Sequence, residues 1–163
     1  MRPVIAGGAE AWLVATELAA AKAAVVLDPL VNLPASFDAL GARLDNAARL
    51  QRAGVVVVFS MTGLAPHFAH KVRQSAGNAV AHGMPWDAAL AGLTANPAAV
   101  FGLGASRGRI ETGMVADLVL WNGDPLEVTS AADQVWVGGK PMSMRSRQTE
   151  LLDRYLPQAA RQP

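Results

Sequence analysis

The sequence predicts an α/β protein whose strands run parallel and are covered on both faces. Three short apolar runs, at 3–6, 24–27 and 55–59, lack the polar alternation of a half-exposed strand. Longer segments with apolar residues at helical spacing separate these runs. Strand, helix, strand, helix, strand is the order that builds a parallel sheet. With 163 residues, 52% hydrophobic and 17% charged, the chain can form a packed core and does not have the composition of a disordered protein.

Two helices are predicted between the three strands. The first spans about 9–22, after the glycine pair that ends the first strand. The second begins at Ser36, a good N-cap residue, and carries Phe37 and Leu40 on one face. Gly54 ends this second helix immediately before the third strand.

The chain after the third strand is predicted to be helical and then to change character. Helices are expected over about 67–81, from Pro85 onward, and from Asn96 to about Gly102. A stretch rich in glycine and serine, 104–108, is expected to be a linker.

The last third of the chain predicts a small antiparallel sheet followed by a helix. The segments 117–121 and 134–137 have strand composition. Gly138 and Gly139 fit a two-residue hairpin turn. A final amphipathic helix is predicted over about 145–155.

Composition excludes several classes of function. Fourteen Lys and Arg against thirteen Asp and Glu give a net charge of +1, which offers no charged surface for nucleic acid or an anionic membrane. The absence of cysteine excludes a disulfide framework, a Cys-ligated zinc site and a thiol nucleophile. No apolar stretch is long enough for a membrane span, and glycines interrupt the first apolar run too early for a signal peptide. We therefore expect a cytoplasmic protein.

One stretch of the C-terminal half carries a specific family resemblance. It contains Asn96-Pro97-Ala98-Ala99, Phe101-Gly102-Leu103, Gly108-Arg109-Ile110, Gly113 and Ala116-Asp117-Leu118-Val119-Leu120-Trp121. This run resembles the C-terminal signature of the amidohydrolase superfamily. The chain is most similar to the imidazolonepropionase-like branch, in which a segment like Gly77-Asn78-Ala79-Val80-Ala81 precedes this signature. The resemblance covers roughly residues 2–156. It implies a metal-dependent hydrolase of non-peptide C–N bonds, built as a TIM-like (β/α)8 barrel beside a small β-sandwich.

The resemblance also implies which part of that fold is present. The three predicted strands resemble the sixth, seventh and eighth barrel strands, so we expect the C-terminal portion of the barrel. An eight-stranded barrel with its helices needs about 200 residues or more. The expected parts are a partial barrel segment over 1–102, a β-sandwich segment over 103–142, and a C-terminal helix and tail over 143–163. An open sheet has an edge strand whose unpaired backbone groups can bind another strand. We therefore expect a homo-oligomer or a chain that supplies the missing strands.

The family's late metal ligands are not matched in this sequence. The resemblance implies zinc or another divalent metal, held in part by a His after strand six and an Asp after strand eight. Here the first position reads Ala6-Gly7-Gly8 and the second reads Ser60-Met61-Thr62-Gly63. We therefore expect no competent metal site in this chain alone, and its catalytic residues stay unassigned.

Other residues are weaker candidates for a site. His67 and His70 would share a helix face and could chelate a metal, and Asp28 follows the second strand at the functional end of a barrel. Ser60, Thr62, His67 and Arg73 are candidate substrate-binding residues. Each also has a structural interpretation: a turn cap for Asp28, exposed positions for the histidines and a surface ion pair for Arg73.

Two functions of different classes remain open. The chain is either the C-terminal segment of an amidohydrolase-like hydrolase that needs further residues for catalysis, or a non-catalytic remnant that acts as an assembly or scaffold module. A small-molecule substrate belongs to the first hypothesis alone. Bound metal would favour the first, and a metal-free symmetric oligomer would favour the second.

Overall fold

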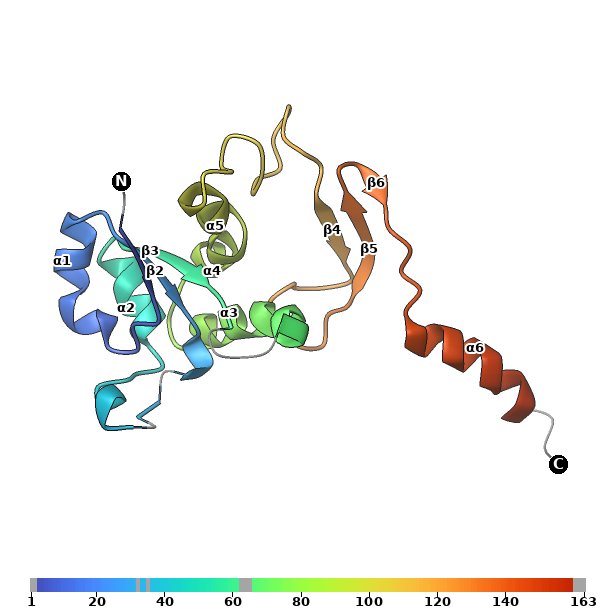
Figure 1. Ribbon diagram of the computed structural model, residues 1–163, viewed down its shortest axis with the longest axis horizontal. Helices are drawn as coiled ribbons and strands as arrows, with labels where there is room; N and C mark the ends of the chain where they lie inside the picture. The colour runs from blue at the N-terminus through green and yellow to red at the C-terminus, as the bar shows by residue number, and fades with distance from the viewer. Residues whose placement is uncertain (1–2, 32, 35, 62–65, 160–163) are drawn as a thin grey trace.

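The computed structural model describes residues 3–31, 33–34, 36–61 and 66–159, without the side chains of 38, 66–68 and 157–159. Three parallel strands form the first sheet: β1 (Val4–Ala6), β2 (Ala24–Leu27) and β3 (Val56–Phe59), in the order β1-β2-β3 (Figure 1). The α/β class and the parallel strands predicted from the sequence are thus confirmed. The central strand β2 is the most buried of the three, with Val25 fully covered and Leu27 1% exposed.

The connection from β1 to β2 contains a 3₁₀ turn, η1 (Ala11–Val14), followed by α1 (Ala15–Ala20). The connection from β2 to β3 contains η2 (Pro29–Val31), η3 (Phe37–Ala39) and α2 (Asn46–Arg52). After β3 come η4 (Pro66–Lys71), α3 (Val72–Ala81), α4 (Trp86–Leu93) and α5 (Ala95–Val100).

The single helix predicted from Ser36 to Gly54 is wrong. Ser36 makes no capping hydrogen bond, and Phe37 is 92% exposed in the short η3 turn. The helix breaks because Gly41 is held by partners outside this segment. Its N–H donates to a carboxylate oxygen of Glu10, and its carbonyl accepts from the indole N–H of Trp12. A regular α-helix therefore starts only at Asn46.

The helix predicted from Asn96 begins earlier, at Ala95, so Asn96 is not its cap. The Asn96 side chain instead donates Nδ2–H to the carbonyl of Val57 at 2.8 Å. This bond ties α5 to β3. Next to it, α4 approaches β3 closely, because a Cβ built at Gly92 would lie 2.8 Å from the ring of Phe59.

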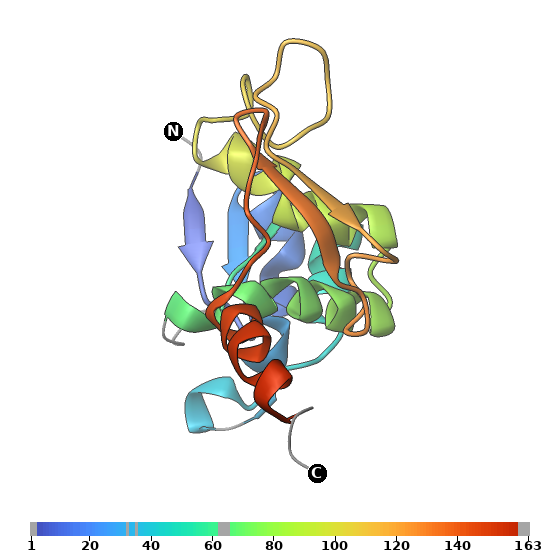
Figure 2. The same cartoon turned by 90° about the vertical axis from the view of Figure 1, so that its right-hand side faces the viewer.

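The C-terminal part forms a second, antiparallel sheet of β4 (Leu118–Trp121), β5 (Ala132–Val137) and β6 (Lys140–Pro141). Gly138 and Gly139 make the predicted hairpin turn, with φ of +57° and +79°. The described residues provide one antiparallel layer here, so the expected β-sandwich is not confirmed. The last helix, α6 (Arg147–Ala159), projects away from both sheets in Figure 1, and in Figure 2 it lies in front of the rest of the chain.

The hydrophobic core lies between the parallel sheet and its helices. Val25, Leu27 and Val57 of the sheet pack with Leu50 of α2, and small alanines of α2, α3 and α4 complete the contact. Alanine lets the helices approach the strands closely, which fixes the positions of the connections at the strand ends. Within the described ranges, no helix has the length and apolar character needed to cross a membrane.

Candidate functional site at the carboxyl edge of the parallel sheet

Each of the three parallel strands ends at the same edge of the sheet. β1 leads into Gly7, β2 into Asp28 and β3 into Ser60. The ladder continues slightly beyond the strands, because Gly7 N–H donates to Val26 at 2.9 Å and Ser60 N–H donates to Leu27 at 3.1 Å. Sites on parallel sheets are found outside the carboxyl ends of the strands, so this edge is the candidate site.

Asp28 is the charged residue set most deeply at this edge. Its side chain is 3% exposed. Oδ1 accepts a hydrogen bond from Leu30 N–H at 3.0 Å and a longer one from the Ser75 hydroxyl at 3.4 Å. Oδ2 is buried and has no hydrogen-bond partner among the residues that the structure describes. The turn-capping role considered from the sequence is therefore present, but it uses one carboxylate oxygen and leaves the other unpaired.

Asn46 holds the connection after β1 in place, a role that no sequence pattern indicated. The residue is fully buried at the start of α2. Its Oδ1 accepts from Trp12 N–H at 3.1 Å, and its Nδ2 donates to Gly8 carbonyl at 2.9 Å. An asparagine at a helix start would normally be interpreted as a cap, so only the fold reveals that it binds a segment more than 30 residues away.

A charged cluster lies beside Asn46, around the Trp12 ring. The guanidinium groups of Arg43 and Arg49 lie 5.3 and 5.0 Å from the centre of this ring. Asp45 accepts from both arginines, at 2.7 Å from Arg43 and 2.8 Å from Arg49. The hydrogen bond from Arg43, aided by Arg49, lowers the pKa of Asp45 to about 2. The cluster thus stabilises the packing of α2 against η1.

Two of the predicted site residues with described side chains, Asp28 and Ser60, lie at this edge. Ser60 is half-buried at the end of β3, whereas Thr62 lies outside the described residues. His67 falls in η4 but its side chain also lies outside them, so the proposed pairing with His70 stays a prediction. The His70 side chain is exposed at the end of the same turn.

The described residues at this edge do not fit a complete metal centre. No group of three His, Asp or Glu side chains in the described part of the chain could hold an ion. Asp28 Oδ2 is the one buried side-chain oxygen without a partner in the described ranges, and a catalytic zinc requires about three protein ligands.

Arg73, a candidate substrate-binding residue, links α3 to the second sheet and to the β4–β5 connection. Its Nη1 donates to the carbonyl of Pro125 at 3.0 Å and also to the carbonyl of Glu127. Its Nη2 donates to the carbonyl of Ser130 at 2.8 Å, and the guanidinium lies 4.9 Å from the centre of the Trp121 ring. These contacts fix the β4–β5 connection against α3. The surface ion pair considered from the sequence is not among the contacts that the structure shows for this side chain.

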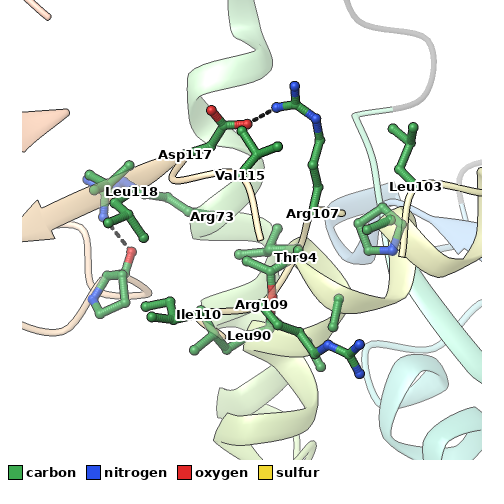
Figure 3. A pocket seen from close by; sticks show the side chains of 18 of the residues that line it. Arg73, Leu90, Thr94, Leu103, Arg107, Arg109, Ile110, Val115, Asp117 and Leu118 are labelled. Carbon is green, nitrogen blue, oxygen red and sulfur yellow. Dashed lines mark hydrogen bonds and ion pairs between the residues drawn. The ribbon is translucent and has the colours of Figure 1, made fainter. Parts of the chain in front are cut away.

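A groove of about 860 Å³ lies between α4, α5 and the β4–β5 sheet (Figure 3). Apolar side chains form most of its wall, including the exposed Phe101, Leu103 and Ile110. Arg107 and Asp117 pair with each other at its rim. Arg73 also lines this groove, whereas the residues that end the parallel strands, Gly7, Asp28 and Ser60, do not.

Comparison with known proteins identifies the class. The sequence profile of the amidohydrolase family matches residues 53–142, which is more than half of the chain. The chain belongs to the amidohydrolase family.

Particular relatives agree with this assignment. An amidohydrolase from Thermotoga maritima matches with a TM-score of 0.77 and 30% identity, over 87% of this chain and 37% of that protein. Amidohydrolase tasK of Hapsidospora irregularis is 47% identical over 58 residues, which cover 36% of this chain and 6% of that protein. A zinc-bound adenosine deaminase from Xanthomonas campestris shares the fold, with a TM-score of 0.62 and 20% identity over 96% of this chain and 42% of that protein. This chain therefore matches less than half the length of each of these relatives.

Proposed function

We propose that this chain is the C-terminal segment of a metal-dependent hydrolase that acts on non-peptide C–N bonds and is not catalytically competent alone. The observation that carries the proposal is the extent of the structural match. The chain superposes on an amidohydrolase over 87% of its own length, yet this corresponds to 37% of that protein. The rest of the relative has no counterpart in this chain.

The chemistry of the carboxyl edge supports the same proposal. Water is a poor nucleophile at neutral pH, and in this class of enzyme a divalent metal lowers its pKa. The residues that end β1, β2 and β3 are Gly7, Asp28 and Ser60, which supply a single carboxylate. One carboxylate cannot hold a catalytic metal, so the metal ligands would come from elsewhere. Ser60, Thr62, His67 and Arg73 are the candidates for contacts to substrate.

The exposed outer strand supports a partner for this segment. All three residues of β1 are exposed, and β1 pairs with β2 alone among the described strands. At the opposite edge of the sheet, strand β3 is contacted by Asn96 and by α4. An uncovered edge strand is a pairing surface. The proposed partner is a chain that supplies the missing barrel strands, or a second copy, and the same assembly would complete the β-sandwich over the β4–β5–β6 sheet.

A non-catalytic assembly module is the alternative function. It is favoured by α6, whose Leu152, Tyr155 and Leu156 are each more than half exposed on a helix that projects from the body. Such a face is typical of a helix that packs against another molecule. A module of this kind would bind partners without any requirement for metal.

Metal content and complementation distinguish these functions. The chain is purified without chelators, and zinc, manganese and iron per chain are measured by mass spectrometry. It is then fused to the part of the Thermotoga amidohydrolase that it does not match, and hydrolysis of N-acyl and cyclic amide substrates is measured. The matched controls are that part alone and the fusion carrying His67→Ala and His70→Ala.

The proposal expects less than one metal ion per isolated chain, with bound metal and turnover in the fusion. About one ion per isolated chain together with turnover would contradict the claim that the segment is incompetent alone. An ion lost with His67→Ala and His70→Ala would identify a rebuilt site in this chain. A stable fusion without metal or turnover would favour the assembly module.

A further inference from the structure

The unpaired oxygen of Asp28 is the strongest anomaly among the described residues. Buried carboxylates in folded proteins are paired with charged groups or satisfied by several hydrogen bonds, because loss of hydration is costly. Asp28 is 3% exposed, and no ion pair of the described residues involves it. Its Oδ2 accepts no hydrogen bond from any described residue.

The residues around Asp28 set the orientation of its carboxylate but do not satisfy all of its hydrogen-bonding capacity. Leu30 N–H and the Ser75 hydroxyl both bind Oδ1, so they set the orientation of the group and leave Oδ2 unpaired. Ser75 is fully buried on α3, and Pro29 is buried next to Asp28. The helix α3 packs against η2, which directly follows Asp28. The group is therefore rigidly held at the end of the central strand, where the chemistry of a barrel takes place.

We infer that Asp28 is a positioning residue whose Oδ2 receives a cationic group, an ammonium or a guanidinium, when the active site is complete. The inference rests on the proposed function, since the cation comes from outside the described residues. A positive charge is the fitting partner because it compensates both the unpaired lone pairs and the buried negative charge. A metal ion fits less well, because no further described ligands lie in a group with Asp28.

The cation has two possible sources with the same chemistry. It is either a lysine or arginine of the missing barrel portion or a positively charged part of the substrate. In both cases the unpaired oxygen of Asp28 lowers the stability of the isolated chain, and its pairing with the cation stabilises the assembled enzyme. Functional residues often lower stability in this way.

The first experiment measures the thermal unfolding midpoint of the isolated chain. Asp28→Asn keeps the acceptor that binds Leu30 and Ser75 but removes the charge. The expected result is an increase of about 2–4 °C. The matched control is Asp45→Asn, which removes a carboxylate paired with two arginines and is expected to lower the midpoint. A decrease for Asp28→Asn similar to that of the control would overturn the inference, because Asp28 would then be an ordinary structural cap.

Two further measurements on the isolated chain also decide the question. A high-resolution crystal structure that shows a well-ordered water bonded to Oδ2 would overturn the inference by supplying the donor. Zinc chloride that raises the midpoint of the wild type but not of Asp28→Asn would assign Asp28 to a metal and overturn it too. Neither result depends on activity, so failure of this inference is distinguishable from failure of the proposed function.

The fusion with the Thermotoga portion then separates the two sources of the cation. If the cation belongs to the barrel, Asp28→Asn lowers the unfolding midpoint of the fusion, the reverse of its effect on the isolated chain, with an unchanged KM. If the cation belongs to the substrate, the midpoint rises as in the isolated chain, and KM increases about tenfold or more for cationic substrates but not for neutral ones. An unchanged midpoint with an unchanged KM and kcat would overturn the inference.

Discussion

Replacing Arg73 with alanine removes a side chain that binds three backbone carbonyls across more than 50 residues of sequence. The bonds to Pro125 and Ser130, at 3.0 and 2.8 Å, are partly buried, whereas the bond to Glu127 is exposed and water can replace it. Each partly buried bond from a charged donor contributes about 1–1.5 kcal/mol. Stacking of the guanidinium on Trp121 adds about 0.5–1 kcal/mol.

The free energy of unfolding should therefore fall by about 3 kcal/mol in Arg73→Ala. For a chain of this size, this lowers the thermal unfolding midpoint by about 6–12 °C. The midpoint is measured by circular dichroism, and limited proteolysis should show earlier cleavage in the connection over 122–131. Arg73→Lys should lie between the wild type and Arg73→Ala, because an ammonium cannot reproduce the planar fork of donors.

Arg52→Ala is the matched control for the loss of an arginine. Arg52 donates to the carbonyl of Ala48 in its own helix, at 3.2 Å, and makes no bond to the second sheet. Its removal should change the midpoint by no more than about 2 °C. The reasoning would be refuted if Arg73→Ala unfolded within that same range, because the carbonyl contacts would then contribute little and the binding role of Arg73 would become the better explanation.

Three further predictions concern the packing of the parallel sheet and its helices. Gly77→Ala should destabilise the chain, because the new Cβ would lie 2.4 Å from the backbone oxygen of Leu126. In most helices the same change is stabilising. A denaturant titration that shows unchanged or higher stability would contradict this contact. Asn46→Ala should lower the free energy of unfolding by about 2–4 kcal/mol, since it leaves two backbone groups without partners in a buried site. The same denaturant titration measures this loss. A loss below about 1 kcal/mol would show that water replaces the amide. The pKa of Asp45, lowered from 3.8 to about 2 mainly by Arg43, predicts an acid dependence. Its stabilising effect is present above about pH 4 and is lost as the pH falls through 2, so thermal midpoints of the wild type and Asp45→Asn should converge over that range; a constant difference down to pH 2 would refute the pairing.

Several features of this protein were determined by the sequence itself. The buried strands could be predicted because continuous apolar runs are local signals, and the turn at Gly138 and Gly139 because both residues need positive φ. The family could also be predicted from a contiguous motif between Asn96 and Trp121. These signals require no knowledge of which distant segments meet.

Only the tertiary structure decided the roles of residues whose partners are distant in sequence. The helix expected from Ser36 fails because Glu10 and Trp12 bind the backbone of Gly41, about 30 residues away. Arg73 links α3 to the β4–β5 connection through partners more than 50 residues distant. Side-chain bonds to backbone leave no periodic pattern, so neither contact could be predicted.

Asp28 shows the same division within a single residue. Its place after the second strand, and hence at the carboxyl edge of a parallel sheet, followed from the sequence. That one of its oxygens is bonded and the other is buried without a partner depends on how α3 and η2 pack around it. Position along the chain follows from local pattern, whereas burial and hydrogen bonding are properties of the packed whole.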